Sequence, residues 1–206
     1  MRRSRACCGA CVPESRRRLF FALWPDAALR TAIALAARAA ARAAGVSGKR
    51  VHDERLHLTL LFLGDLDAPS EARALQAAAA VRAPGFELVL DQAGSFYRSK
   101  VLWIGTRQAP AALTGLSQAL RAALDSAGVA FDRKALAPHV TCYRDIRPPL
   151  RAVAIEPLTW GAREFALVHS APGARGTAQY HVVSQWSLQD VPMHTVKTGQ
   201  PGKVPE

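Results

Sequence analysis

The chain has 206 residues, 50% of them hydrophobic, and a formal net charge of +11, which is enough sequence to bury a sizeable core. Its four cysteines do not make a disulfide framework in a chain this long, and no apolar run approaches the roughly 20 residues that a membrane-spanning helix needs. The basic excess suits a polyanionic partner such as RNA, although a solvated arginine-rich surface would give the same charge.

Residues 1–17 are predicted to be a disordered basic leader. They are rich in arginine and serine and poor in acids, as transit peptides are, but they lack the apolar core of a secretory signal. Cys7, Cys8 and Cys11 could be metal ligands, yet a structural zinc site needs four ligands and usually a second cluster. We therefore expect no metal and no cofactor, and a cytoplasmic location.

The folded region is predicted to begin with a strand at 18–23, a short apolar and aromatic run. A Pro-Asp break follows it, and Asp26 is a good N-cap for a helix. Residues 27–44 then form an amphipathic helical pattern, with apolar side chains in one stripe and arginines away from it. Gly45 occupies the usual position at which such a helix ends.

The stretch 50–63 is predicted to hold a strand, a few residues after His52, in which His57 and Thr59 interrupt an apolar run. Residues i and i+2 of a strand point to the same face, so the imidazole and the hydroxyl would lie side by side. Strict alternation places Leu61 and Leu63 on that face as well. A strand this apolar on both faces is covered on both sides, one side being core and the other the floor of a cleft.

A second helix, with Ser70 as its expected cap, follows the turn after this strand. Strands are predicted at 86–91 and 101–105. The loop between them, 92–100, carries aromatic and cationic side chains, which can stack on and clamp a nucleotide. Packing of Phe96 under the loop explains the same pattern equally well.

A third predicted helix, 110–127, leads to a second strand with the same spacing, at His139 and Thr141. The residues from 189 to 206 are polar, without periodicity, and are predicted to be a disordered tail. Three more strand candidates complete the body: 153–160, 163–170 and 180–188.

This order of about eight strands and three helices predicts an α+β protein with hairpin-connected antiparallel sheets. No linker is evident inside 18–188, so this region is predicted to be a single domain. The repeat of a strand, a helix and a His-x-Thr strand indicates two similar lobes. The two His-x-Thr pairs could then close on one small anion.

Only two of the six histidines, His57 and His139, have a threonine at i+2. A single buried histidine would by default be a hydrogen-bonded core residue. A matched pair in two predicted strands favours catalysis, because imidazole titrates near neutral pH and two such groups can act as acid and base. His169 and His181, in the late strands, are interpreted as structural or surface residues.

These residues resemble the 2H phosphoesterases, and among them the bacterial and archaeal RNA 2′,3′-cyclic phosphodiesterases historically called 2′-5′ RNA ligases. The resemblance covers about residues 18–188 and does not extend to the leader or the tail. It implies a bilobal fold, with two pseudo-symmetric antiparallel sheets flanked by helices and a central cleft. The strongest matches are at 18–22, 56–64 and 138–145, and weaker ones lie at 101–105 and 180–188.

The resemblance also implies metal-independent hydrolysis of RNA 2′,3′-cyclic phosphate ends to 2′-phosphomonoesters, with His57 as proton donor and His139 as proton acceptor. Thr59 and Thr141 would hydrogen-bond the phosphoryl oxygens and stabilise the transition state. Arg144 is expected to contact the phosphate, although strict alternation points it away from the cleft unless a bulge redirects it. Weak reversible 2′-5′ ligation would be the reverse displacement, with a 5′-hydroxyl in place of water.

Two alternatives remain open. One is another 2H activity, such as cleavage of 2′-5′-linked oligonucleotides or of ADP-ribose cyclic phosphate, which loop residues such as Phe96 and Arg98 would decide. The other is a non-catalytic RNA-binding module, against which the two intact His/Thr pairs argue, since binding needs no acid–base couple. The expected partners are RNA with 2′,3′-cyclic phosphate ends or small cyclic nucleotides, without a membrane, and we expect a monomer.

Overall fold

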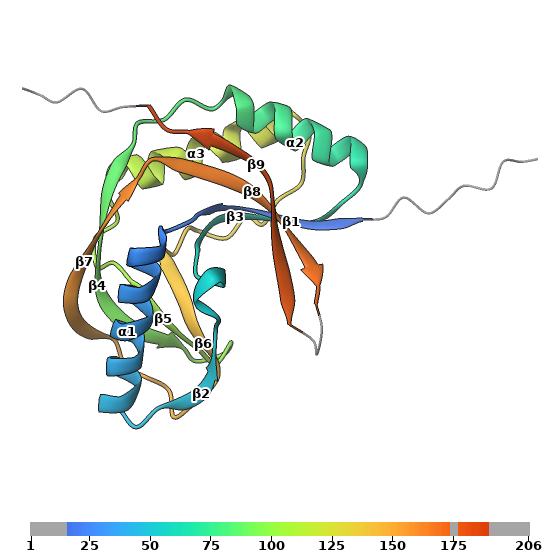
Figure 1. The fold of residues 1–206 in the computed structure, drawn as a ribbon. Helices are drawn as coiled ribbons and strands as arrows, with labels where there is room; N and C mark the ends of the chain where they lie inside the picture. The colour runs from blue at the N-terminus through green and yellow to red at the C-terminus, as the bar shows by residue number, and fades with distance from the viewer. Residues whose placement is uncertain (1–15, 174–176, 190–206) are drawn as a thin grey trace, which may run out of the picture.

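The structure is a computed structural model that describes residues 16–173 and 177–189. Its strands and helices confirm the α+β class (Figure 1). None of the helices in these residues is both long and apolar enough to cross a membrane. In chain order the elements are β1 (Arg17–Leu23), α1 (Ala27–Ala43), β2 (Ser47–Arg50), the 3₁₀ turn η1 (Asp53–Arg55), β3 (Leu58–Leu66), α2 (Ala68–Ala80), β4 (Phe86–Phe96), β5 (Val101–Gly105), α3 (Ala111–Ser126), β6 (His139–Arg147), β7 (Val153–Ala162), β8 (Glu164–Pro172) and β9 (Ala178–Ser187).

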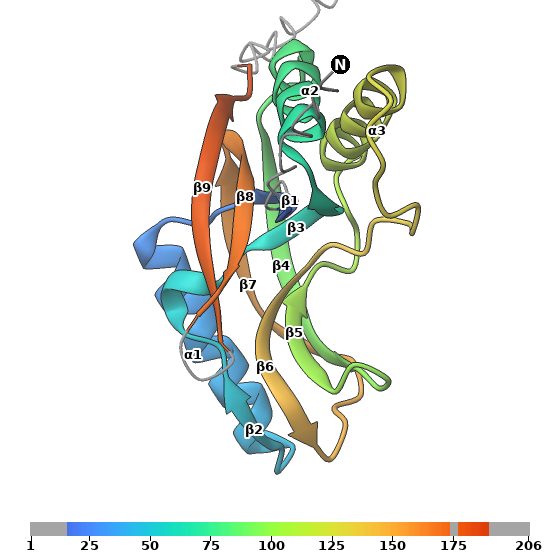
Figure 2. The ribbon, with the colours of Figure 1, turned by 90° about the vertical axis from the view of Figure 1, so that its right-hand side faces the viewer.

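All nine strands belong to one antiparallel sheet, ordered β7-β4-β5-β6-β3-β1-β8-β9, with β2 paired to β6. The sheet has two lobes, β7-β4-β5-β6-β2 and β3-β1-β8-β9, which are joined by a single residue pair, Leu58 of β3 and Val140 of β6. The two sheets expected from the sequence are therefore two parts of one sheet, because β3 and β6 diverge after this joining pair. Figure 2 shows the lobes turning away from each other beside β3 and β6.

The helices divide between the lobes. Helix α1 packs against β5, β6 and β7, whereas α2 and α3 pack against each other and against β9 and β3 respectively (Figure 1). Asp26 caps α1 as predicted, its Oδ1 accepting from Leu29 N at 2.8 Å. The predicted cap of α2 is wrong: Asp67 is the cap and accepts from Ser70 N at 2.9 Å. The helix begins earlier because Pro69 needs no hydrogen-bond partner in the first turn.

The strand predicted within the stretch 50–63 begins later than expected, at Leu58. Strand β2 pairs with β6 and ends at Arg50, η1 follows, and β3 pairs with β1 from Leu58 onward. The chain must leave one lobe and enter the other between these strands, and η1 makes that crossing. His57 therefore lies immediately before β3, on the segment that crosses from lobe to lobe.

Strand β3 also departs from strict alternation. Between Thr59 and Leu61 the β1–β3 ladder contains one extra residue, Leu60, which is a β-bulge. Leu61 is consequently buried, while Phe62 is 50% exposed. The predicted face shared by His57 and Leu61 is wrong, since the bulge turns Leu61 into the core.

The remaining boundaries shift modestly. Much of the predicted loop 92–100 is strand, because β4 continues to Phe96 and pairs with β5 along its last residues. The three late strands are confirmed as β7, β8 and β9. At the two ends, Arg17 belongs to β1, and Gln189 N donates to Ala83 O at 2.9 Å. Residues 1–15 of the predicted leader, with the Cys7, Cys8 and Cys11 cluster, and residues 190–206 of the predicted tail lie outside the described residues.

The joining pair gives a test of the core. Leu58 is fully buried, and Leu58→Ala is expected to lower the free energy of unfolding by about 2–5 kcal/mol, because a cavity forms where the lobes meet. Leu35, on the outer face of α1, is 55% exposed. Leu35→Ala is the matched control and should change stability by no more than about 0.5 kcal/mol. Urea unfolding followed by circular dichroism measures both, and equal losses would contradict this account.

Candidate active site

The four predicted His and Thr residues lie around the joining pair. Extending its antiparallel register by one residue in each direction sets His57 opposite Thr141 and Thr59 opposite His139. All four are half-buried, whereas Leu58 and Val140 of the joining pair are both fully buried. Because neighbouring residues of a strand alternate in direction, the core takes the joining pair and the opposite side takes the four polar residues. Each histidine thus approaches the threonine of the other motif.

Both imidazoles are held in the same way. Nδ1 of His57 lies 2.7 Å from the carbonyl oxygen of Arg55, and Nδ1 of His139 lies 2.6 Å from that of Ala137. A carbonyl oxygen only accepts, so Nδ1 is the protonated nitrogen in both rings. The remaining nitrogen, Nε2, can accept a proton when the ring is neutral and donate one when the ring is charged. Each motif therefore presents one Nε2 for proton transfer.

Aromatic rings enclose His57. Trp24 stacks on the imidazole with ring centroids 5.0 Å apart and planes 14° apart. Phe20 lies 5.0 Å away, and Tyr180 meets the ring edge-on at 5.1 Å. These rings come from β1 with the residue after it and from β9, so that two segments distant in sequence fix one side chain. They leave the imidazole little rotational freedom and little contact with water.

Both imidazoles have pKa values below the ordinary 6.5. Burial lowers the pKa of His57 to about 4; the carbonyl of Arg55 raises it, and the charges of His139 and Arg144 lower it further. Burial also lowers the pKa of His139, against the effect of the Ala137 carbonyl. In both cases loss of hydration disfavours the charged ring. An anion bound between the rings would favour protonation.

Phe96 stands beside His139, with its ring edge-on at 4.8 Å between centroids. The same ring lies 5.5 Å from Trp103. Gly94 makes this packing possible, because a Cβ there would come within 2.5 Å of the Trp103 ring. Phe96 is 37% exposed, so it packs on the site residue and still presents part of its ring outside.

Arg144, the expected phosphate contact, is an exposed residue of β6 that lies just before an irregularity of that strand. The β2–β6 ladder shifts register between Arg144 and Arg147, and Asp145 has a φ of 55°. Lys49 pairs with Asp145 at 3.0 Å, and Arg144 has no salt bridge within the described residues. Its guanidinium is close enough to His57 to contribute to the lowered pKa of that ring.

Sequence reasoning missed Arg55. Its backbone carbonyl fixes His57, and its guanidinium carbon lies 5.1 Å from the centroid of the Tyr180 ring. Its Nε is buried and has no hydrogen-bond partner among the residues described. Its position two residues before the histidine was visible, but the second motif has Ala137 there, so the comparison of the motifs gave no signal. Trp24 and Tyr180 were also missed, since neither belongs to a motif.

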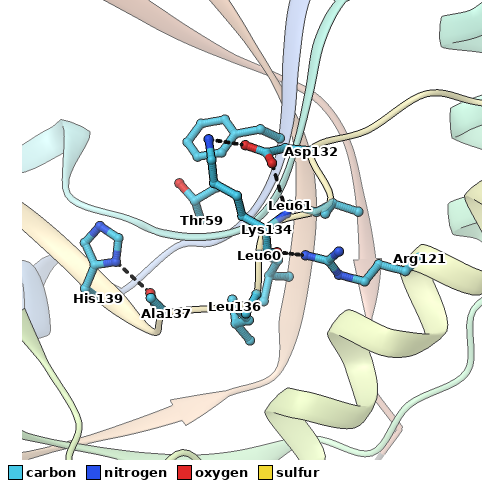
Figure 3. Close-up of a pocket in the computed structure, with 11 residues that line it drawn as sticks. Thr59, Leu60, Leu61, Arg121, Asp132, Lys134, Leu136, Ala137 and His139 are labelled. Carbon is cyan, nitrogen blue, oxygen red and sulfur yellow. Dashed lines mark hydrogen bonds and ion pairs between the residues drawn. The ribbon is translucent and has the colours of Figure 1, made fainter. Parts of the chain in front are cut away.

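A cavity of about 220 Å³ adjoins Thr59 and His139. Figure 3 shows His139 on one side of it and Arg121, from α3, on the other. The loop before β6 closes it: Asp132 N donates to the Phe62 carbonyl at 2.8 Å, and the same aspartate pairs with a neighbouring lysine at 3.0 Å. Such a concave space next to convergent polar groups is typical of a substrate site.

Other candidate groups take no part in this arrangement. Cys142 is buried, and burial raises the pKa of its thiol to about 12, which makes it a poor nucleophile. His169 and His181 pair with each other across β8 and β9, 6.1 Å between ring centroids. In residues 16–173 and 177–189, no three His, Cys, Asp or Glu side chains are grouped so that they could hold a metal ion.

Comparison with known proteins places these features in context. Residues 25–172 match the family described as the 2′-5′ RNA ligase superfamily. The RNA 2′,3′-cyclic phosphodiesterase of Escherichia coli (strain K12) is 36% identical over 146 residues, which are 69% of this chain and 81% of that protein. The crystal structure of E. coli LigT in apo form matches with a TM-score of 0.72 at 36% identity, over 85% of this chain and 99% of that one. The complex of LigT with 3′-AMP matches with a TM-score of 0.69, also at 36% identity, over 84% and 98%.

Proposed function

Because the chain belongs to the 2′-5′ RNA ligase superfamily, we propose that it hydrolyses RNA 2′,3′-cyclic phosphate ends to 2′-phosphomonoesters. The observation that carries the proposal is the pair of imidazoles on one side of the sheet. Each has Nδ1 bonded to a carbonyl and Nε2 left for proton transfer. Two imidazoles in opposite protonation states are what an in-line displacement at phosphorus uses.

The reaction begins with a water molecule that attacks phosphorus from the side of His139. Neutral His139 takes a proton from this water at Nε2 as the new P–O bond forms. Protonated His57 gives its Nε2 proton to the ribose 3′-oxygen as the P–O3′ bond breaks. His139 has taken up one proton and His57 has released one, so the two rings have exchanged protonation states. Because the P–O3′ bond breaks, the product is a 2′-phosphate. The roles of the rings follow the family resemblance.

Charge on the phosphoryl oxygens is stabilised by neighbouring groups. The hydroxyls of Thr59 and Thr141 donate hydrogen bonds to the non-bridging oxygens, and Arg144 adds a positive charge near His57. Groups fixed in this way before the reaction stabilise the developing charge without reorganising. Arg55, whose buried Nε has no partner among the described residues, can supply a further donor.

The low pKa of His57 is consistent with its role as acid once substrate is present. The free ring is disfavoured as a cation by burial and by the charges of His139 and Arg144. A phosphodiester carries one negative charge and binds between these groups. Its charge opposes both effects and raises the pKa of His57 in the complex.

The pH dependence of the reaction tests this scheme. Activity requires one protonated and one neutral imidazole, so it falls at high pH when no acid remains and at low pH when no base remains. Both pKa values lie below 6.5 in the free protein. We therefore expect a bell-shaped profile of kcat/KM with its maximum below pH 6.5, and a kcat maximum at higher pH because bound substrate raises the pKa values.

The same measurements made with a metal chelator serve as the control. The proposed chemistry uses only protons, hydroxyls and guanidinium groups, so neither profile should change. Loss of activity on chelation would instead indicate a metallophosphoesterase. A kcat/KM maximum well above pH 6.5 would contradict the assignment of the two rings as acid and base.

The most direct test is incubation with an oligoribonucleotide that ends in a 2′,3′-cyclic phosphate, followed by identification of the product. A 2′-phosphate is expected, and a 3′-phosphate would show that the 2′-oxygen departs instead. Binding without turnover would favour the RNA-binding alternative. Cytoplasmic location and a monomeric state stay predictions.

The cavity beside His139 also favours weak 2′-5′ ligation as a second activity. It adjoins the side from which water attacks in the scheme above. A nucleoside with a 5′-hydroxyl placed there would replace water, and His139 would take the proton of that hydroxyl. Formation of a 2′-5′ bond from cyclic-phosphate and 5′-hydroxyl oligonucleotides is the corresponding measurement.

A further inference from the structure

One end of the molecule carries a concentration of exposed cationic side chains. They come from β2, from the turn between β4 and β5, and from the far part of β6 with the segment after it (Figure 2). We call this group the basic end. Its members are Lys49, Arg98, Lys100, Arg144, Arg147 and Arg151.

The sheet brings these residues together although they are distant in sequence. Lys49 is the direct cross-strand partner of Arg144. On the other side of β6, Ile146 N donates to the Lys100 carbonyl at 3.0 Å, which fixes the β4–β5 turn against the same strand. The segment that carries Arg151 is held beside this turn, where Leu150 N donates to Ser95 Oγ at 2.9 Å.

Few acids neutralise the basic end. In the described part of the chain, Lys49 pairs with Asp145, and the neighbouring Arg50 of β2 pairs with Asp53, whereas the other five members form no salt bridge. On the α3 side of the cleft, two of the cations are paired with acids, while Arg121 bonds to the Lys134 carbonyl. Arg133 bonds to Asp125 at 2.6 Å and Lys134 to Asp132 at 3.0 Å. Among these residues, more cations without a salt bridge lie at the basic end than on the α3 side.

The basic end also reaches the candidate active site. Arg144 acts electrostatically on His57, and Phe96, at the start of the β4–β5 turn, contacts His139. Tyr97 follows in that turn with 79% of its surface exposed. Exposed aromatic rings among cations are typical of surfaces that bind single-stranded nucleic acid through stacking and backbone charge.

We propose that the basic end binds the phosphodiester backbone of single-stranded RNA on the 5′ side of the terminal cyclic phosphate. This inference rests on the proposed function, which places that terminal group between His57 and His139. The remaining chain then leaves the cleft along β6 toward Arg147 and the β4–β5 turn, because Arg98, Lys100 and Arg147 form no salt bridge with any described residue. The protein would therefore prefer oligonucleotides over mononucleotides.

The test compares a nucleoside 2′,3′-cyclic phosphate with an oligoribonucleotide that carries the same terminal group. The double variant Arg98→Gln/Arg147→Gln removes two cations of the basic end. It should lower kcat/KM for the oligonucleotide about tenfold at low salt and leave the mononucleotide unchanged. Each lost phosphate contact reduces the slope of log affinity against log salt by about 0.7 for a single strand. The double variant should therefore flatten that slope by about 1.4.

The matched control is Arg73→Gln/Arg133→Gln, which removes the same charge from α2 and from the α3 side of the cleft. It should leave both substrates and the salt slope unchanged. Binding of a fluorescently labelled oligonucleotide, measured by anisotropy, follows the same variants independently of turnover. Unchanged mononucleotide hydrolysis in the basic-end variant also shows that it is folded.

Three outcomes would overturn the inference: equal oligonucleotide binding by the wild type and the basic-end variant, an equal loss in the control variant, or an equal loss for both substrates. Failure of the proposed function looks different. In that case the wild type would hydrolyse neither substrate, and anisotropy would still show whether the basic end binds RNA.

Discussion

Alanine in place of either His57 or His139 is expected to lower cyclic-phosphate hydrolysis by at least ~10²-fold. Each imidazole is fixed through Nδ1 by a backbone carbonyl, and its Nε2 is the atom that transfers a proton in the proposed reaction. The fold should survive both changes, because the two side chains are half-buried and lie outside the main core. Steady-state kinetics on a nucleoside 2′,3′-cyclic phosphate, together with circular dichroism, measures both effects.

The control is His169→Ala, which removes a histidine from β8 and should leave the rate unchanged. An aryl phosphodiester, whose leaving group needs no proton, distinguishes the proton donor from the proton acceptor. His57→Ala should retain most of the activity on that substrate, whereas His139→Ala should lose it. Near-normal turnover of the cyclic phosphate by both alanine variants would contradict the assignment. The double variant should be little worse than either single one, since the rings act as a unit.

Removal of either threonine hydroxyl should lower kcat by about 10²-fold, the usual cost of losing one donor to a charged transition state. Thr59→Val and Thr141→Val keep the shape of the side chain, and valine suits a strand as well as threonine does. The register around the joining pair brings each threonine toward the opposite histidine, so both hydroxyls are available to a phosphate held between the rings.

The control for these variants is Thr159→Val, an exposed position of β7, where no change in kinetics is expected. The role of the hydroxyls is decided by whether the loss of activity in these variants appears in kcat or in KM. Bonds that strengthen as charge develops lower kcat when they are lost. A loss confined to KM would show that the threonines only hold the substrate, and would contradict their proposed part in stabilising the transition state.

Local signals in the sequence were sufficient for many elements. Asp26 caps α1 as expected, and β5 occupies the predicted residues. Strand β2 was missed because Ser47–Arg50 has no apolar alternation and all four residues are exposed. It is a strand because β6 lies beside it. Gly48 permits that approach, since a Cβ there would come within 2.9 Å of the Arg144 carbonyl.

The residues of the candidate site likewise include some that the sequence could predict and some that it could not. The i+2 spacing was enough to select His57 and His139 and to predict that both belong to one site. It could not reveal Trp24 or Tyr180, because their contacts with the imidazole depend on the sheet order β3-β1-β8-β9. Strict alternation also failed at Leu60, where the bulge depends on how β1 pairs with β3. Spacing within a segment is visible in one sequence, whereas contacts between distant strands are not.

The joining pair has a mechanical consequence. It is the one residue pair at which β3 and β6 join, and the four His and Thr residues of the candidate site lie immediately on either side of it. Rotation of one lobe about this pair would change both His-to-Thr separations at once, since each histidine belongs to one lobe and its opposite threonine to the other. The proposed acid, the proposed base and the threonine hydroxyls would therefore be aligned or misaligned together by any change in the orientation of the lobes.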